Sequence, residues 1–116
     1  MGLAFDEKNR QALLGLARRY LDMRKLRNVR PERSRVERVG PPSTEETFRH
    51  VRHLLERVCL VLGMGEEWRK DYDAPLSVFW MGEAQGLMWQ LGILGQEEIE
   101  LDAREMASQF VAPKEA

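Results

Sequence analysis

The sequence is poor in cysteine, since Cys59 is the only one among 116 residues. A single thiol excludes an internal disulfide framework, and no zinc-finger spacing is present. A chain without disulfides suits a reducing compartment, so we expect a cytoplasmic protein. Cys59 falls on an apolar helical stripe, where we expect it to act as a small hydrophobic residue.

Long apolar runs are also missing. No stretch approaches the roughly 18 consecutive apolar residues that a membrane-spanning helix needs. The first residues turn acidic at Asp6, too early for the apolar core of a signal peptide. With 43% hydrophobic and 32% charged residues, the composition predicts a water-soluble globular protein, and the length fits one domain over residues 1–116.

Catalytic motifs are absent from the sequence as well. It contains no Gly-rich phosphate loop and no nucleophile elbow, and no serine or cysteine has a convincing base. The acidic run from Glu97 to Asp102 is typical of solvated helix starts. His50 and His53 share one helical side, but the neighbouring arginines would repel a metal cation. We therefore predict a protein without catalytic activity, cofactor or metal.

What is present is helical periodicity, with no alternating pattern long enough for a strand. The expected helices are separated by glycine and proline: about Asp6 to Leu26, Ser43 to Gly63, Asp73 to Leu91, and Asp102 to Pro113. The pattern predicts an all-α fold, a compact bundle of about four helices. A long Arg/Pro-rich loop, residues 29–43, separates the first two helices. This loop is predicted to be mobile, although a short helical piece from Pro31 to Val39 is compatible with the sequence.

Caps and apolar faces define these helices further. Ser43 and Glu46 have the spacing of a capping box. In the last helix Asp102 is expected to cap, with Glu105 as its partner, and a preceding helical turn over residues 96–101 is compatible with the sequence. One turn before the third helix should bury Trp68 and Tyr72. The expected core positions of the first two helices are Leu13, Leu16, Ala17, Tyr20, Phe48, Val51, Leu55, Val58, Cys59 and Leu62, and the expected polar positions of the first are Arg10, Arg18, Arg19 and Asp22.

The third predicted helix is apolar on nearly all sides. Glu83 is its only charged residue between Leu76 and Leu91. One stripe contains Leu76, Trp80, Ala84, Leu87 and Leu91, widened by Met81 and Met88, while Val78, Phe79 and Trp89 lie on the other side beside two glycines. Such a helix is either a central core helix or part of a homodimer or partner interface. The candidate partner-binding residues are Phe79, Trp80, Gly82, Gly86, Met88 and Trp89.

Charge is divided unevenly along the chain. Residues 1–57 carry 14 basic and 8 acidic residues, a net of +6, whereas residues 58–116 carry 4 and 11, a net of −7. Arginine clusters can neutralise phosphates, so the alternative nucleic-acid-binding residues are Arg24, Arg27, Arg30, Arg33 and Arg35. No aromatic residue lies between Leu21 and Thr47 to stack on unpaired bases. A solvated or protein-facing loop is the other interpretation of this segment.

The pairs Trp80-Met81 and Met88-Trp89, together with Leu91 and the Arg-rich composition before Gly40, give the chain a general likeness to one class of regulator. It resembles the small helical anti-activators of proteobacteria that bind LuxR-type quorum-sensing regulators. Phage-encoded inhibitors of bacterial defence are similar in size. The resemblance implies a protein that sequesters a transcription factor and competes with its dimerisation. We therefore predict a non-enzymatic regulatory or inhibitory protein, a homodimer, acting through protein–protein interaction.

Overall fold

The computed structural model describes residues 7–29, 43–64 and 69–110 of the chain. These ranges contain five helices, α1 (Glu7–Leu21), α2 (Arg24–Arg27), α3 (Thr44–Leu62), α4 (Lys70–Gln90) and α5 (Gln96–Phe110), and no strand. The all-α prediction is confirmed. The predicted Arg/Pro-rich loop, with its Pro31–Val39 piece, lies almost entirely outside the described residues.

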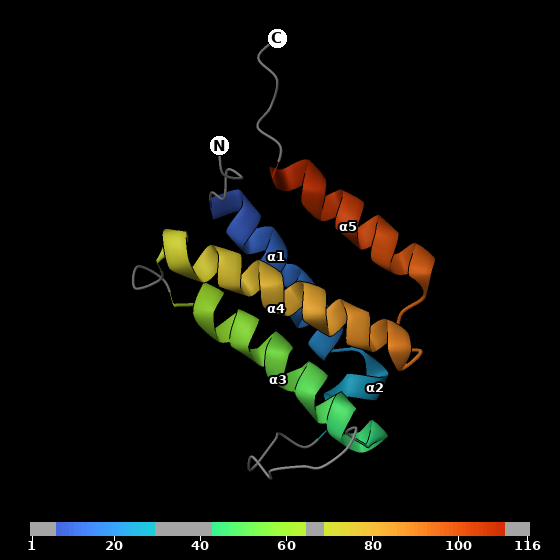
Figure 1. Cartoon of the computed structure of the whole chain (residues 1–116). Helices are drawn as coiled ribbons and strands as arrows, with labels where there is room; N and C mark the ends of the chain where they lie inside the picture. The colour runs from blue at the N-terminus through green and yellow to red at the C-terminus, as the bar shows by residue number, and fades with distance from the viewer. Residues whose placement is uncertain (1–6, 30–42, 65–68, 111–116) are drawn as a thin grey trace.

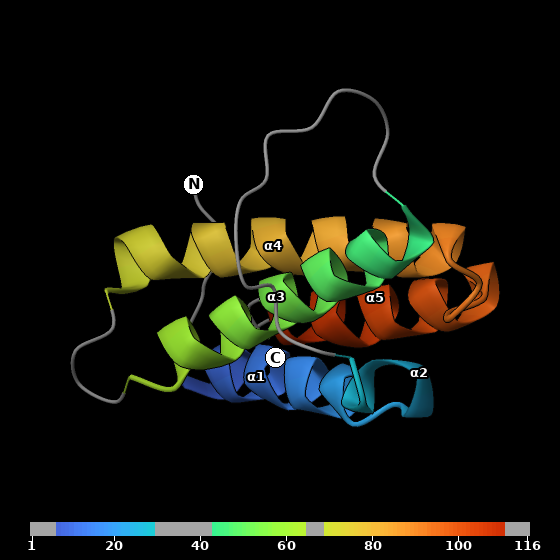
Figure 2. The same ribbon diagram turned by 90° about the horizontal axis from the view of Figure 1, so that it is seen from below.

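The long helices are stacked around a shared core. Figure 1 shows α4 in front of α1, with α3 below and α5 above. Seen from below in Figure 2, α3 lies between α4 and the layer of α1 and α2. α3 contacts both α4 and α1, whereas α5 contacts mainly α1. One side of α4 therefore faces away from every other described helix.

The core is formed by the stripes that the periodicity predicts. Its buried residues are Leu13, Leu14, Leu16, Ala17, Tyr20, Leu26, Val51, Leu54, Leu55, Val58, Leu62, Ala74, Met81, Ala84, Met88 and Leu94. Phe48 and Cys59 are half-buried against this cluster. The burial of these side chains removes apolar surface from water, which is the main force that holds the helices together. The predicted apolar faces of the first two helices are confirmed.

The start of α3 is set by Ser43, as the capping motif predicts. The Ser43 hydroxyl oxygen accepts a hydrogen bond from the Glu46 amide at 3.2 Å, and the hydroxyl donates to the Glu46 carboxylate at 2.8 Å. The helix ends at Leu62, with Gly63 as its C-cap. The cap therefore fixes where α3 begins.

The first predicted helix is too long by one turn. α1 ends at Leu21, and Met23 begins the separate helix α2 in an extended conformation. No glycine or proline marks this break. It redirects the chain so that Leu26 is fully buried. Arg10, predicted on the polar side, is also buried: its Nε donates to the Leu62 carbonyl at 2.6 Å, which satisfies an acceptor at the end of α3.

Two predicted helix starts are also wrong, because caps other than the expected ones are used. α4 begins at Lys70, before Asp73, whose carboxylate accepts from the Arg69 amide at 2.6 Å. The Tyr72 side chain is 67% exposed, not buried. α5 begins at Gln96 and not at Asp102, with the Glu98 carboxylate accepting from the Gly95 amide at 3.2 Å. Trp68 lies outside the described residues.

Candidate functional site

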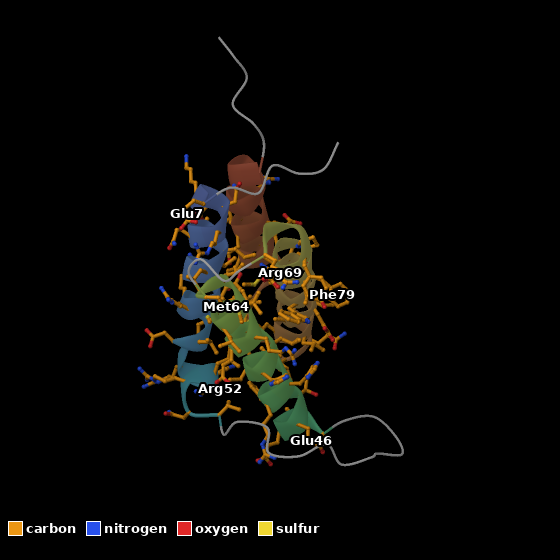
Figure 3. The ribbon with its side chains drawn as sticks, turned by 90° about the vertical axis from the view of Figure 1, so that its left-hand side faces the viewer. Glu7, Glu46, Arg52, Met64, Arg69 and Phe79 are labelled. Carbon is orange, nitrogen blue, oxygen red and sulfur yellow. The ribbon has the colours of Figure 1, made fainter. Side chains whose placement is uncertain are left out.

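The outer side of α4 carries four of the large hydrophobic residues that are exposed among the described residues, Tyr72, Val78, Phe79 and Trp89. Phe79 is 67% exposed, Trp89 53% and Val78 38%, and Tyr72 extends the surface toward the start of the helix. Figure 3 shows Phe79 pointing away from the other helices. We call the surface formed by Val78, Phe79, Gly82, Gly86 and Trp89 the α4 outer face. The prediction that these residues lie opposite the core is confirmed.

Gly82 and Gly86 lie in the middle of the α4 outer face, one turn apart. A Cβ atom added at either glycine would meet no other atom within 4 Å. Glycine inside a helix costs about 1 kcal/mol relative to alanine. The packing of the described residues gives no reason for either glycine. Two costly residues at the centre of an exposed apolar surface are consistent with close approach by another chain.

The side of α4 that is buried in the core is turned about the helix axis relative to the predicted stripe. Its buried residues are Ala74, Ser77, Met81, Ala84 and Met88. Met88 is one of the predicted partner-binding residues, but its side chain is fully buried and is therefore not available to a partner. Trp80 is half-buried against α3, where the Arg57 guanidinium lies 4.8 Å from its ring centroid. Of the six predicted partner-binding residues, the outer face retains Phe79, Gly82, Gly86 and Trp89.

One pair of polar side chains borders the α4 outer face on the side of α3. His50 Nε2 lies 3.4 Å from the Glu83 carboxylate, and both side chains are about two-fifths exposed. His53 stacks on His50 with ring centroids 6.4 Å apart. Glu83 is thus placed where a partner on the outer face would reduce its contact with water. The sequence shows that Glu83 is isolated among apolar residues, but it gives no sign that His50 is its neighbour.

The predicted nucleic-acid-binding arginines are only partly within the described residues. Arg24 and Arg27 are exposed on α2, while Arg30, Arg33 and Arg35 lie outside. The α2 end is held by Arg52, which donates to the carbonyls of Leu26 and Arg27 at 3.0 and 2.8 Å. A hollow of about 550 Å³ between α2 and α3 is lined by Lys25, Asn28, Val29, Thr44, Glu45, Phe48 and Arg49. Phe48, which follows directly after the segment from Leu21 to Thr47 that has no aromatic residue, contributes an aromatic ring to this hollow.

A buried polar network joins α1, α4 and α5, and sequence reasoning missed it. The Tyr20 hydroxyl donates to Asp102 at 2.5 Å and accepts from Gln85 at 3.1 Å. Arg19 forms an ion pair with the same carboxylate at 2.5 Å. Burial, followed by the hydrogen bond to Asp102, raises the pKa of Tyr20 well above its usual value of 10.0. Asp102 lies three residues after the half-buried Ile99 and so on the same side of α5, which is the signal that could have shown its burial.

Among residues 7–29, 43–64 and 69–110, no three His, Cys, Asp or Glu side chains lie where they could share a metal ion. None of the described helices is long and apolar enough to span a bilayer. Cys59 is half-buried, and burial raises the pKa of its thiol, so the thiol is poorly activated as a nucleophile.

Comparison with known proteins found no matching family model, no matching curated protein and no matching solved structure.

Proposed function

We propose that this chain is a non-enzymatic regulatory or inhibitory protein that acts by protein–protein interaction through the α4 outer face. The exposure of Phe79 and Trp89 beside two otherwise unexplained helical glycines supports the proposal. Exposed apolar surface of this kind favours association, because a partner removes it from water. Aromatic residues are also enriched where proteins meet.

The proposed occupant of the α4 outer face is a second copy of the chain. Between Leu76 and Leu91 the helix carries one charged residue, Glu83, and His50 lies beside it. Two such nearly uncharged faces can meet without bringing a strip of like charges together. The glycines allow the two helix backbones to approach closely, and this approach adds van der Waals contact.

For the biological role, we propose that the same surface sequesters a transcriptional regulator. An apolar helical face that pairs with its own copy is chemically suited to compete for a similar face on another dimeric protein. This action is also what the resemblance to anti-activators of LuxR-type regulators implies. In this proposal the homodimer is the resting form, and the regulator replaces one copy.

The test of self-association is replacement of Trp89 with alanine. We expect the dissociation constant of the dimer to rise about a thousandfold, since the variant removes one buried aromatic anchor from each copy and each anchor contributes about 2 kcal/mol or more. Circular dichroism should show an unchanged fold, because the indole is 53% exposed in the isolated chain. Sedimentation equilibrium of the full chain measures the constant.

Leu101→Ala is the matched control, because Leu101 is 64% exposed on α5, outside the α4 outer face. This variant should associate as the wild type does. A wild type that remains monomeric at several hundred micromolar would contradict self-association. Equal weakening by both variants would place the contact elsewhere.

The second candidate function is nucleic-acid binding by the Arg-rich segment. Exposed Arg24 and Arg27, with Lys25 in the adjoining hollow, are the observation that favours it. Replacing Arg27, Arg30, Arg33 and Arg35 with alanine would then abolish binding and its salt dependence. Under the proposed function, the same variant keeps its dimer dissociation constant within about twofold. Electrophoretic mobility shifts at two salt concentrations, combined with sedimentation, separate the candidates.

A further inference from the structure

Four residues of the α4 outer face, Phe79, Gly82, Gly86 and Trp89, have a spacing that is the same when read in either chain direction. Phe79 lies three residues before Gly82, and Trp89 lies three residues after Gly86. We infer that a second copy crosses α4 antiparallel, with Gly82 of one copy over Gly86 of the other. The inference rests on the proposed function, and it specifies the direction of the two helices and the pH dependence of the same contact.

The antiparallel direction follows from what each residue would meet. When Gly82 faces Gly86 of the second copy, Phe79 faces Trp89 of that copy, and the symmetry produces this pair twice. Each aromatic side chain then finds a large apolar partner at the rim of the close glycine contact. In a parallel dimer each residue would meet its own counterpart, and the macrodipoles of the two α4 helices would be aligned unfavourably.

The same symmetry gathers charge along one edge of the contact. A two-fold axis that is perpendicular to antiparallel helices leaves corresponding side chains on the same lateral side. Both copies of Glu83 therefore lie on the α3 side of the interface, with both copies of His50 beside them. Two carboxylates near a partly desolvated edge repel one another, whereas two imidazolium groups between them would offset the repulsion.

Association should consequently take up protons. Histidine is the side chain that ordinarily gains charge between about pH 8 and 5. His50 is contacted by His53 on its own helix and by Glu83 on α4, and along α3 Glu46 lies one turn before it, Arg49 directly before it and Arg57 two turns after it. Glu83 is the only one of these contributed by α4, so it is the group whose charge His50 offsets at the contact. We expect the dimer to dissociate about 3- to 10-fold more readily at pH 8 than at pH 6, the range for two partly exposed ion pairs.

The direction of the helices is tested by disulfide cross-linking of the full chain with Cys59 replaced by alanine. Gly82→Cys and Gly86→Cys each place a thiol where the isolated chain has free space. A mixture of the two variants should cross-link several-fold faster than either variant alone. Faster cross-linking of each variant with itself would overturn the antiparallel arrangement. A dimeric wild type with no cross-linking in any sample would also overturn it.

The charged edge is tested by sedimentation at pH 6 and pH 8. Glu83→Gln should remove the difference between the two pH values, whereas Glu100→Gln, on exposed α5 surface, should retain it. A wild-type dissociation constant that is equal at both pH values overturns the proposed role of His50 and Glu83 at the interface but leaves the dimer itself supported. A wild type that is monomeric at both pH values overturns the proposed self-association together with this inference.

Discussion

Replacing Asp102 with alanine is expected to lower the free energy of unfolding by about 2–3 kcal/mol. The carboxylate is buried and accepts a hydrogen bond from the Tyr20 hydroxyl at 2.5 Å. A hydrogen bond to a charged buried group contributes about 1.5–3 kcal/mol, and the loss of its acceptor leaves the hydroxyl donor unpaired. The ion pair with Arg19 adds less than about 1 kcal/mol, because the Arg19 side chain is 56% exposed.

The loss of stability in the Asp102→Ala variant should be concentrated at α5. Over the part of α5 whose side chains are described, residues 96–105, Asp102 is buried and Ile99 is half-buried, while the others are exposed. Hydrogen exchange should therefore rise most in α5, and urea denaturation gives the total change. Glu100→Ala is the control, because Glu100 is exposed on the same helix. An unfolding free energy equal to that of the control would show that the Tyr20–Asp102 contact contributes little.

The same network makes the stability depend on alkaline pH. The pKa of Tyr20 is raised in the folded chain, first by burial and then by the bond to Asp102. The folded state thus holds a proton that the unfolded chain releases above pH 10. This contribution is complete below pH 10 and declines as the pH rises beyond it. Tyr20→Phe should be less stable than the wild type at pH 8, and the difference should shrink above pH 10.

The sequence was most informative where a local signal agreed with the tertiary packing. Ser43 and Glu46 specify a cap by their spacing alone, and the stripe that follows is buried as the period requires. The α4 outer face was found because so many apolar residues cannot all be enclosed by the few helices of a small domain. In both cases a property of one helix was sufficient.

The failures concern residues whose role depends on a distant partner. Asp102 is a residue type that often caps helices, but here its carboxylate accepts a hydrogen bond in the core from Tyr20, which is 82 positions away in the sequence. Periodicity places Arg10 on a polar face, but its side chain is buried because it donates a hydrogen bond to the Leu62 carbonyl at the end of α3. The pairing of His50 with Glu83 likewise depends on how α3 lies against α4. Periodicity cannot supply such contacts, because it describes one helix at a time.

Replacing Gly86 with leucine is expected to separate folding from association. A leucine forms helix more readily than glycine by about 1 kcal/mol, and an added Cβ meets nothing within 4 Å in the isolated chain. The monomer should therefore be as stable as the wild type or more so. The dimer should weaken about a hundredfold or more, because the side chain holds the two backbones apart and so removes contact along the whole face.

Gly15→Leu provides the matched control for this variant. Gly15 is also an exposed glycine within a helix, and an added Cβ there again meets nothing within 4 Å. It lies on α1, away from the α4 outer face, so its replacement should stabilise the helix in the same way and leave the dimer intact. Urea denaturation at low concentration measures folding, and sedimentation equilibrium at high concentration measures association. If Gly86→Leu unfolds the monomer, or if it associates as tightly as Gly15→Leu, the glycines do not form the crossing point and the α4 outer face is not the dimer contact.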